Sequence, residues 1–140
     1  KASRGATGVA GARGPSDAFA ARASGVVRTL GGTFATLVSK PLPAGSFVVM
    51  AKAGIDNASA GTSVTCRLRQ DAAVLDTATT SLAPDTGLAT DDDRRVVSLL
   101  GSVTTTAPGT LALECRSEGD ALPAQAVEPS LVAVQVATLQ

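Results

Sequence analysis

The sequence predicts an all-β protein built as an antiparallel sandwich. Stretches in which apolar and polar residues alternate recur along the chain, and turn-forming residues separate them about every ten residues. Val, Thr and Ser are abundant, and no segment keeps a helical period with caps at both ends. Short alternating strands at this spacing are typical of two antiparallel sheets packed face to face.

The first half of the chain is expected to begin with a short strand over residues 26–30 and a second over residues 33–38. Two prolines and a glycine then predict a turn or irregular crossing over residues 40–45. Residues 46–53 form the strongest predicted strand, and both of its faces are apolar, which indicates a central strand covered on two sides. Residues 62–70 alternate and are predicted to form the next strand.

The second half is expected to hold four more strands. They cover residues 71–82, 94–106, 110–116 and 131–139. Loops or turns are predicted over residues 83–93, 107–110 and 117–129, where Pro, Gly and acidic residues gather. Placing the last strand near the first would bring both ends of the domain to one end of the sandwich.

Cys66 and Cys115 are the two cysteines, and each points to the apolar side of its predicted strand. Their apolar neighbours on those faces are Val64, Leu68, Leu111 and Leu113. An even cysteine count favours a disulfide, which would close a loop worth roughly 4 kcal/mol on the loop-entropy model. The alternative is two buried free thiols that pack as small hydrophobic residues.

The composition excludes several classes of function. The chain has no His, Trp or Tyr, so Ser-His-Asp and Cys-His catalysis are excluded, and a metal site with two cysteines is disfavoured. A glycosidase would need two carboxylates in a groove lined by aromatic side chains. The chain has several carboxylates but no Trp or Tyr to line such a groove. These carboxylates are Asp71, Asp76, Asp85, Glu118 and Asp120. We therefore expect no enzyme activity and no cofactor.

Charge and hydropathy narrow the partners further. Twelve basic and twelve acidic residues give a net charge of zero, which argues against nucleic acid or an anionic membrane as partner. No apolar run has the length of a transmembrane helix, so no membrane insertion is expected. The core must be built from Val, Leu and Ala, which have little volume, and we expect association between chains to supply part of the burial.

Asp91, Asp92 and Asp93 form the sharpest polar cluster, and carboxylate oxygens are ligands that Ca²⁺ accepts. Three adjacent residues do not all point one way on a strand, however, and Arg94 and Arg95 follow directly. A solvated loop is therefore the favoured interpretation of this weak metal candidate.

Arg67, Arg69, Arg116 and Glu114 lie on the polar faces of the two cysteine strands. If those strands are neighbours, the four side chains form a cross-strand charge ladder worth at most about 1 kcal/mol per pair. An anion-binding patch is the functional alternative.

Glycine recurs at every third position at Gly5, Gly8, Gly11 and Gly14, with Pro15 after the last. This period is the signature of a collagen triple helix, whose axis admits only glycine; a Gly-rich flexible linker is the alternative. Four triplets span about 37 Å, too short for a stable triple helix alone. We therefore expect residues 1–16 to be the end of a longer collagen-like stalk and residues 17–140 to be a head domain, with Phe19 entering the head.

Gly-X-Y repeats that run directly into a small β-domain resemble the collagen-like proteins with a C-terminal trimeric head, such as the globular domain of complement C1q and bacterial spore-surface proteins. Within the head, residues 42–53 resemble the strand entry common in that family, where a proline and a turn glycine precede an aromatic residue. The cysteine strands, with the turn at residues 108–110, resemble a secreted actinobacterial version. The resemblance implies a C1q/TNF-like jelly-roll that assembles as a homotrimer and registers the three collagen chains.

A threefold axis in such a trimer would be lined by apolar strand faces. The expected interface residues are Val48, Met50, Val132, Val134 and Val136. The expected role is that of a structural trimerisation head on a secreted, cell-surface or virion-surface protein of a high-GC bacterium or its phage. The alternative is the receptor- or glycan-binding tip of an adhesin or phage tail fibre with the same fold.

Overall fold

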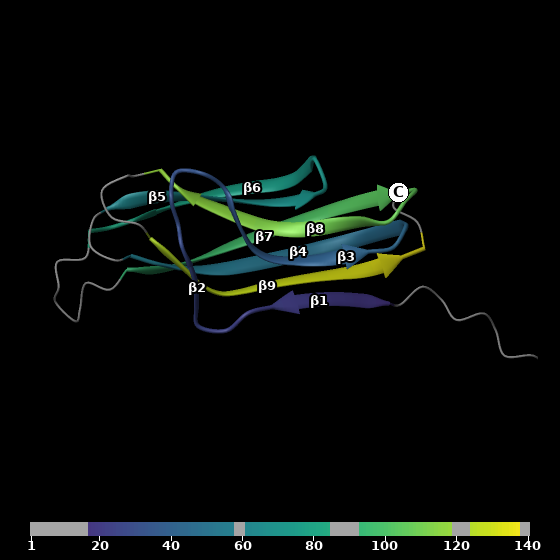
Figure 1. The fold of residues 1–140 in the computed structure, drawn as a ribbon, viewed down its shortest axis with the longest axis horizontal. Coiled ribbons are helices and arrows are strands. Elements are labelled where there is room, and N and C mark those ends of the chain that lie inside the picture. The colour runs from purple at the N-terminus through teal and green to yellow at the C-terminus, as the bar shows by residue number, and fades with distance from the viewer. Residues whose placement is uncertain (1–16, 58–60, 85–92, 119–123, 138–140) are drawn as a thin grey trace, which may run out of the picture.

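The computed structural model describes residues 17–57, 61–84, 93–118 and 124–137, and these residues form two antiparallel sheets packed face to face (Figure 1). Sheet A contains, in spatial order, β1 (Ala18–Arg22), β9 (Gln125–Val136), β4 (Gly45–Asp56) and β7 (Arg94–Thr105), and β2 (Val26–Thr29) also pairs with β9. Sheet B contains β3 (Ala35–Leu42), β8 (Gly109–Ser117), β5 (Thr62–Gln70) and β6 (Ala73–Leu82). The predicted antiparallel sandwich is confirmed.

The strand order is that of a jelly roll. β1 and β2 pair with successive parts of β9 and act as one interrupted edge strand, so each sheet has four strand positions. From β2 onward the chain crosses to the opposite sheet at every connection except the β5–β6 hairpin. This two-sheet exchange of eight strand positions is the jelly-roll arrangement. The predicted triplets at Gly5, Gly8, Gly11 and Gly14 lie outside the described residues.

Both ends of the described domain lie at the same end of the sandwich, as predicted. β1 runs antiparallel to β9, with Ala18 opposite Val134, and the backbone N–H of Gln135 donates to the carbonyl oxygen of Asp17 at 2.9 Å (Figure 1). Phe19 enters the sandwich and packs edge-on against Phe47, with 5.8 Å between ring centroids. The chain preceding residue 17 therefore joins the domain at the rim of sheet A.

β4 lies between β7 and β9, so the prediction of a central strand is confirmed. Its side chains that face sheet B are buried in the common core. They are Phe47, Val49, Ala51, Ala53 and Ile55. The prediction that β4 is covered on two sides is wrong for the single chain, because sheet B covers one face and leaves Met50 on the other face half exposed.

β6 closes one side of the sandwich by packing against β7 of the other sheet. The backbone N–H of Leu100 donates to Oδ2 of Asp76 at 2.9 Å. A Cβ added at Gly101 would lie 3.0 Å from the Cβ of Leu75, so the glycine leaves the space that Leu75 fills. The two sheets are therefore joined at this corner by a side-chain cap and a close contact.

Two predicted loops are strands in the structure. Residues 40–42 continue β3 through Pro41, because β3 is an edge strand in which a missing backbone donor on the outer side costs nothing. β9 begins at Gln125, inside the predicted loop 117–129. Its Pro129 is accommodated at a register irregularity where Glu128 adopts a positive φ of 48°.

The hairpin between β5 and β6 corrects a third boundary. Asp71 was expected to start a strand, but it forms the turn with a φ of 48°. Its carboxylate accepts the N–H of Thr110 at 2.9 Å, which fixes the turn against β8. Asx side chains stabilise turns in this way because they bond to nearby backbone groups.

Cys66 and Cys115 form the predicted disulfide, and both are fully buried. The pairing register places them directly opposite each other on β5 and β8, so the bridge links neighbouring strands of sheet B. It therefore fastens one sheet across 49 residues of chain and does not join the two sheets.

Replacing both cysteines by alanine should lower the free energy of unfolding by roughly 4 kcal/mol, because the unfolded chain loses a long closed loop. Urea denaturation followed by circular dichroism measures the change. Reductant should lower the stability of the wild type by a similar amount and leave the double variant unaffected. Equal stabilities of the oxidised wild type and the variant would show that the bridge contributes nothing.

Candidate functional site

The five predicted interface residues lie together on the outer face of sheet A, the face that points away from sheet B. Val48 and Met50 of β4 lie opposite Val134 and Val132 of β9, and Val136 follows on β9. They alternate with residues that face the core, which is why strand pairing gathers them on the second face. The structure thus brings the predicted residues into one apolar strip.

β7 extends this strip with residues that the predicted interface did not include. Leu100 lies opposite Met50, and Val96 lies four residues away on β7, beyond Ser98 on the same face. Their exposed fractions are 62% for Leu100 and 65% for Val96, compared with 50% for Met50. The sequence does show that Val96 and Leu100 face away from the core, because they alternate with Val97 and Leu99. The alternation does not show that β7 lies beside β4.

A shallow hollow of about 530 Å³ lies in this strip. Met50, Leu100 and Val132 supply much of its apolar wall, and Lys52 and Asp76 contribute opposite charges. A second, polar hollow shares Lys52 and borders Arg22 of β1. The outer face of sheet A therefore carries an apolar cluster with Lys52 beside it on β4, Arg22 on β1 and Asp76 of β6 next to β7. An apolar centre with polar groups around it is the composition of a protein contact surface.

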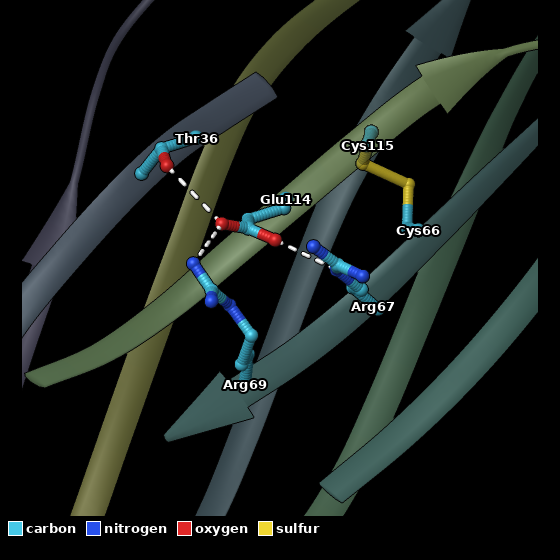
Figure 2. Close-up of polar contacts among 6 residues, drawn as sticks. All are labelled: Thr36, Cys66, Arg67, Arg69, Glu114 and Cys115. Carbon is cyan, nitrogen blue, oxygen red and sulfur yellow. Dashed lines mark hydrogen bonds and ion pairs between the residues drawn. A yellow bond between two sulfur atoms is a disulfide. The ribbon is translucent and has the colours of Figure 1, made fainter. Parts of the chain in front are cut away.

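On the outer face of sheet B, Glu114 of β8 is the centre of a charged cluster (Figure 2). Its side chain is only 5% exposed. Nε of Arg67 donates to Oε2 at 2.7 Å, and a terminal nitrogen of Arg69 donates to Oε1 at 2.6 Å. Thr36 of β3 donates to the same carboxylate at 3.5 Å. The predicted cross-strand charge ladder forms, but its carboxylate is buried, unlike that of a surface pair.

Burial and hydrogen bonding act on Glu114 in opposite directions. Burial raises the pKa of the carboxyl group, and the hydrogen bonds and charges of Arg67 and Arg69 lower it. The net result is a pKa below the usual value of 4.5. Glu114 is therefore ionised in the neutral protein and holds both guanidinium groups in place.

Phe34, which the sequence did not single out, completes this cluster. The guanidinium carbon of Arg67 lies 3.9 Å from the centroid of the Phe34 ring, and that of Arg116 lies 4.9 Å from it. Arg116 also pairs with the exposed carboxylate of Glu118 at 3.2 Å. Since all three arginines of the patch have carboxylate partners, the cluster fits an internal structural network better than an anion-binding patch.

Of the acidic run, Asp91 and Asp92 lie outside the described residues. Asp93 accepts the N–H of Ala83 at 2.8 Å and pairs with Arg95, and the backbone hydrogen bond, with a contribution from Arg95, lowers the pKa of Asp93 below its usual value. Among the described residues, no three His, Cys, Asp or Glu side chains are grouped to hold a metal ion. The described part of the chain also has no helix of the length and apolarity that a membrane span requires.

Comparison with known proteins supports the fold. No family model matches the chain, and no curated protein sequence matches it. Among solved structures, the VP2 subviral particle of infectious bursal disease virus is similar over 94% of this chain, with a TM-score of 0.59 and 16% identity. The T=1 particles derived from that virus give a TM-score of 0.52 and 15% identity over 94% of this chain.

The chain spans only 37% and 36% of the length of those two viral chains. At this level of identity the likeness defines the class of fold alone, a β-sandwich shared with a protein of virus particles. The architecture and the apolar outer face of sheet A therefore carry the functional argument.

Replacing Glu114 by glutamine should destabilise the fold by on the order of 2 kcal/mol at neutral pH, because charge-assisted hydrogen bonds to two arginines are weakened. The folded-state pKa is lowered, so the stabilisation is present above about pH 4.5 and is lost as the pH falls through the folded-state pKa. Urea denaturation from pH 7 to pH 3 should show the two stability curves converging in acid.

The matched control is glutamine at Glu118, whose carboxylate is half exposed. This control should change stability by less than about 0.5 kcal/mol. A Glu114 variant whose stability stays parallel to that of the wild type in acid would contradict the assignment.

Proposed function

We propose that this domain is the trimeric head of a collagen-like protein, which holds three chains together and registers their Gly-X-Y segments. The observation that carries the proposal is the apolar outer face of sheet A, which one chain leaves uncovered. Met50 is 50% exposed and Leu100 is 62% exposed, and these two neighbours lie in one strip with three valines of β9. Contiguous apolar patches of this kind mark association surfaces.

The position of the stalk supports the same arrangement. Asp17, to which residues 1–16 are attached, bonds to Gln135 at the end of sheet A. A stalk that leaves beside the association face is brought close to the stalks of the other copies. Holding three chains together raises their effective concentration, which is what nucleation of a triple helix requires.

The disulfide supports a place outside the reducing cytoplasm. Cys66 and Cys115 are fully buried and bridged, and disulfides of this type persist in oxidising environments. We propose a secreted, cell-surface or virion-surface location.

A non-catalytic role is part of the proposal. The chain has no histidine, and two of its carboxylates are occupied by backbone hydrogen bonds, Asp71 with Thr110 and Asp76 with Leu100 and Thr77.

The second candidate function is a receptor- or glycan-binding tip of an adhesin or tail fibre. The outer face of sheet B favours this candidate, because it would remain accessible in a trimer that associates through sheet A.

The first experiment is the native mass of the oxidised protein, measured by light scattering with and without residues 1–16. A trimer in both forms supports the proposal that the head specifies threefold assembly. A trimer only in the longer form would place the assembly information in the Gly-X-Y segment. A monomer in both forms would overturn the proposal.

Replacing Met50 by glutamate should dissociate the trimer into folded monomers, because three carboxylates would be brought together in an apolar contact. Light scattering reports the mass and circular dichroism reports the fold. Glutamate at Ser39, an exposed residue of β3 in sheet B, is the matched control and should leave the trimer intact. Equal masses for both variants would show that the outer face of sheet A is not the interface.

A further inference from the structure

We infer that the three copies close a ring in which the β1 edge of sheet A in one copy packs against the β7 edge of sheet A in the next, with Leu100 seated on Ala20. The inference rests on the proposed trimer and specifies which surfaces of its copies meet. The partner is a second copy of this chain. Four observations carry the inference: the direction of the axis, the register of the strands, the shapes of the edge residues and the distribution of charge.

The direction of the axis follows from the place where the stalk joins. Residues 1–16 precede Asp17, which lies at one end of the strands of sheet A. A shared stalk leaves along the symmetry axis, so the axis runs roughly along the strands. Three equal faces arranged around such an axis form a prism, in which each face meets its neighbour edge to edge. Rotation by a threefold axis pairs unlike edges, and β1 and β7 are the terminal strands of sheet A, with β6 of sheet B lying against β7.

The strand register then determines which residues meet. A pure rotation adds no shift along the axis, so contacting groups lie at the same height. One row of cross-strand partners runs across the whole sheet at the height of Leu100. Its members are Ala20 on β1, Val132 on β9, Met50 on β4 and Leu100 on β7. In the ring, Leu100 of one copy faces Ala20 of the next, while Met50 and Val132 point toward the axis.

The shapes of the two edge residues are complementary. Leu100 is 62% exposed and protrudes from β7, whereas Ala20 on β1 is exposed and has only a methyl group. A large side chain against a small one lets two surfaces approach closely without a void. Two β7 edges would instead bring leucine against leucine, and two β1 edges would leave a gap between alanines.

The charges also favour unlike edges. Arg22 belongs to the neighbouring row of the β1 edge, two residues or about 7 Å from Ala20. It forms no ion pair within the described chain. Asp76 lies at the β7 edge, where it accepts the N–H of Leu100. Packing β1 against β7 brings the arginine toward the carboxylate.

The test uses disulfide trapping in the full chain. The double variant Ala20→Cys with Leu100→Cys is oxidised and analysed on a non-reducing gel, alongside light scattering of the wild type. Both new cysteines replace exposed residues, and the native cysteines are already bridged and buried. We expect covalent dimers and trimers with no larger species, because a closed ring of three has three such links, and reductant should abolish them.

Three controls make the result decisive. Each single variant should run as a monomer on the same gel, and so should Ser39→Cys with Leu100→Cys, whose first cysteine lies in sheet B. A trimeric wild type whose double variant fails to cross-link, or a single variant that forms covalent dimers, would overturn the unlike-edge contact and leave the proposed trimer standing. A monomeric wild type would overturn both.

Discussion

The structure depends on one constraint: a two-layer sandwich covers only one face of each sheet. β4 and β9 carry apolar side chains on both faces, and sheet B can bury only the inner set. Phe47, Val49 and Leu131 are buried between the sheets. The same alternation places Met50 and Val132 on the outer face. A strand that is apolar on both faces fits a position that is covered on both sides. The sequence therefore predicted burial of both faces of β4, whereas the single chain buries only the inner face.

The outer faces of the two sheets differ in the side chains that cover them. Sheet B covers its own strand faces with a network in which a buried glutamate orients Arg67 and Arg69 and Phe34 lies against Arg67 and Arg116. The outer face of sheet A carries an ion pair between Asp56 and Arg94 and a hydrogen bond between Ser46 and Thr104. The apolar side chains of Met50, Leu100 and Val132 lie between these two polar contacts. Sheet B therefore presents a paired polar surface, whereas sheet A presents the apolar face on which the proposed association rests.

Much of this could be predicted from the alternation of apolar residues. It placed both cysteines on inward faces, identified β4 as central and gathered the five valine and methionine positions of the outer face. The alternation did not predict features that depend on which strands lie side by side. Pro41 is tolerated because β3 happens to be an edge strand, and Pro129 because β9 bulges beside it. The burial of Glu114 depends on β5 and β3 flanking β8, and the addition of Leu100 to the apolar strip depends on β7 pairing with β4. Periodicity reports the face of a residue but does not report which strand lies next to it.

The distribution of stabilising contacts bears on how such a head would assemble. The disulfide and the Glu114 network both lie in sheet B, and the closure of the β6–β7 corner uses Asp76 and Leu75 of the same sheet. These contacts lie within one chain, so they act before any second copy is present. A folded protomer then presents the outer face of sheet A with its strands already in register. Strand register sets the height of each residue along the strands. In the proposed trimer, rigid protomers would therefore fix one common height at which the three Gly-X-Y segments begin. Registration of a triple helix needs that common starting height, and a face built from paired strands supplies it more precisely than a flexible surface would.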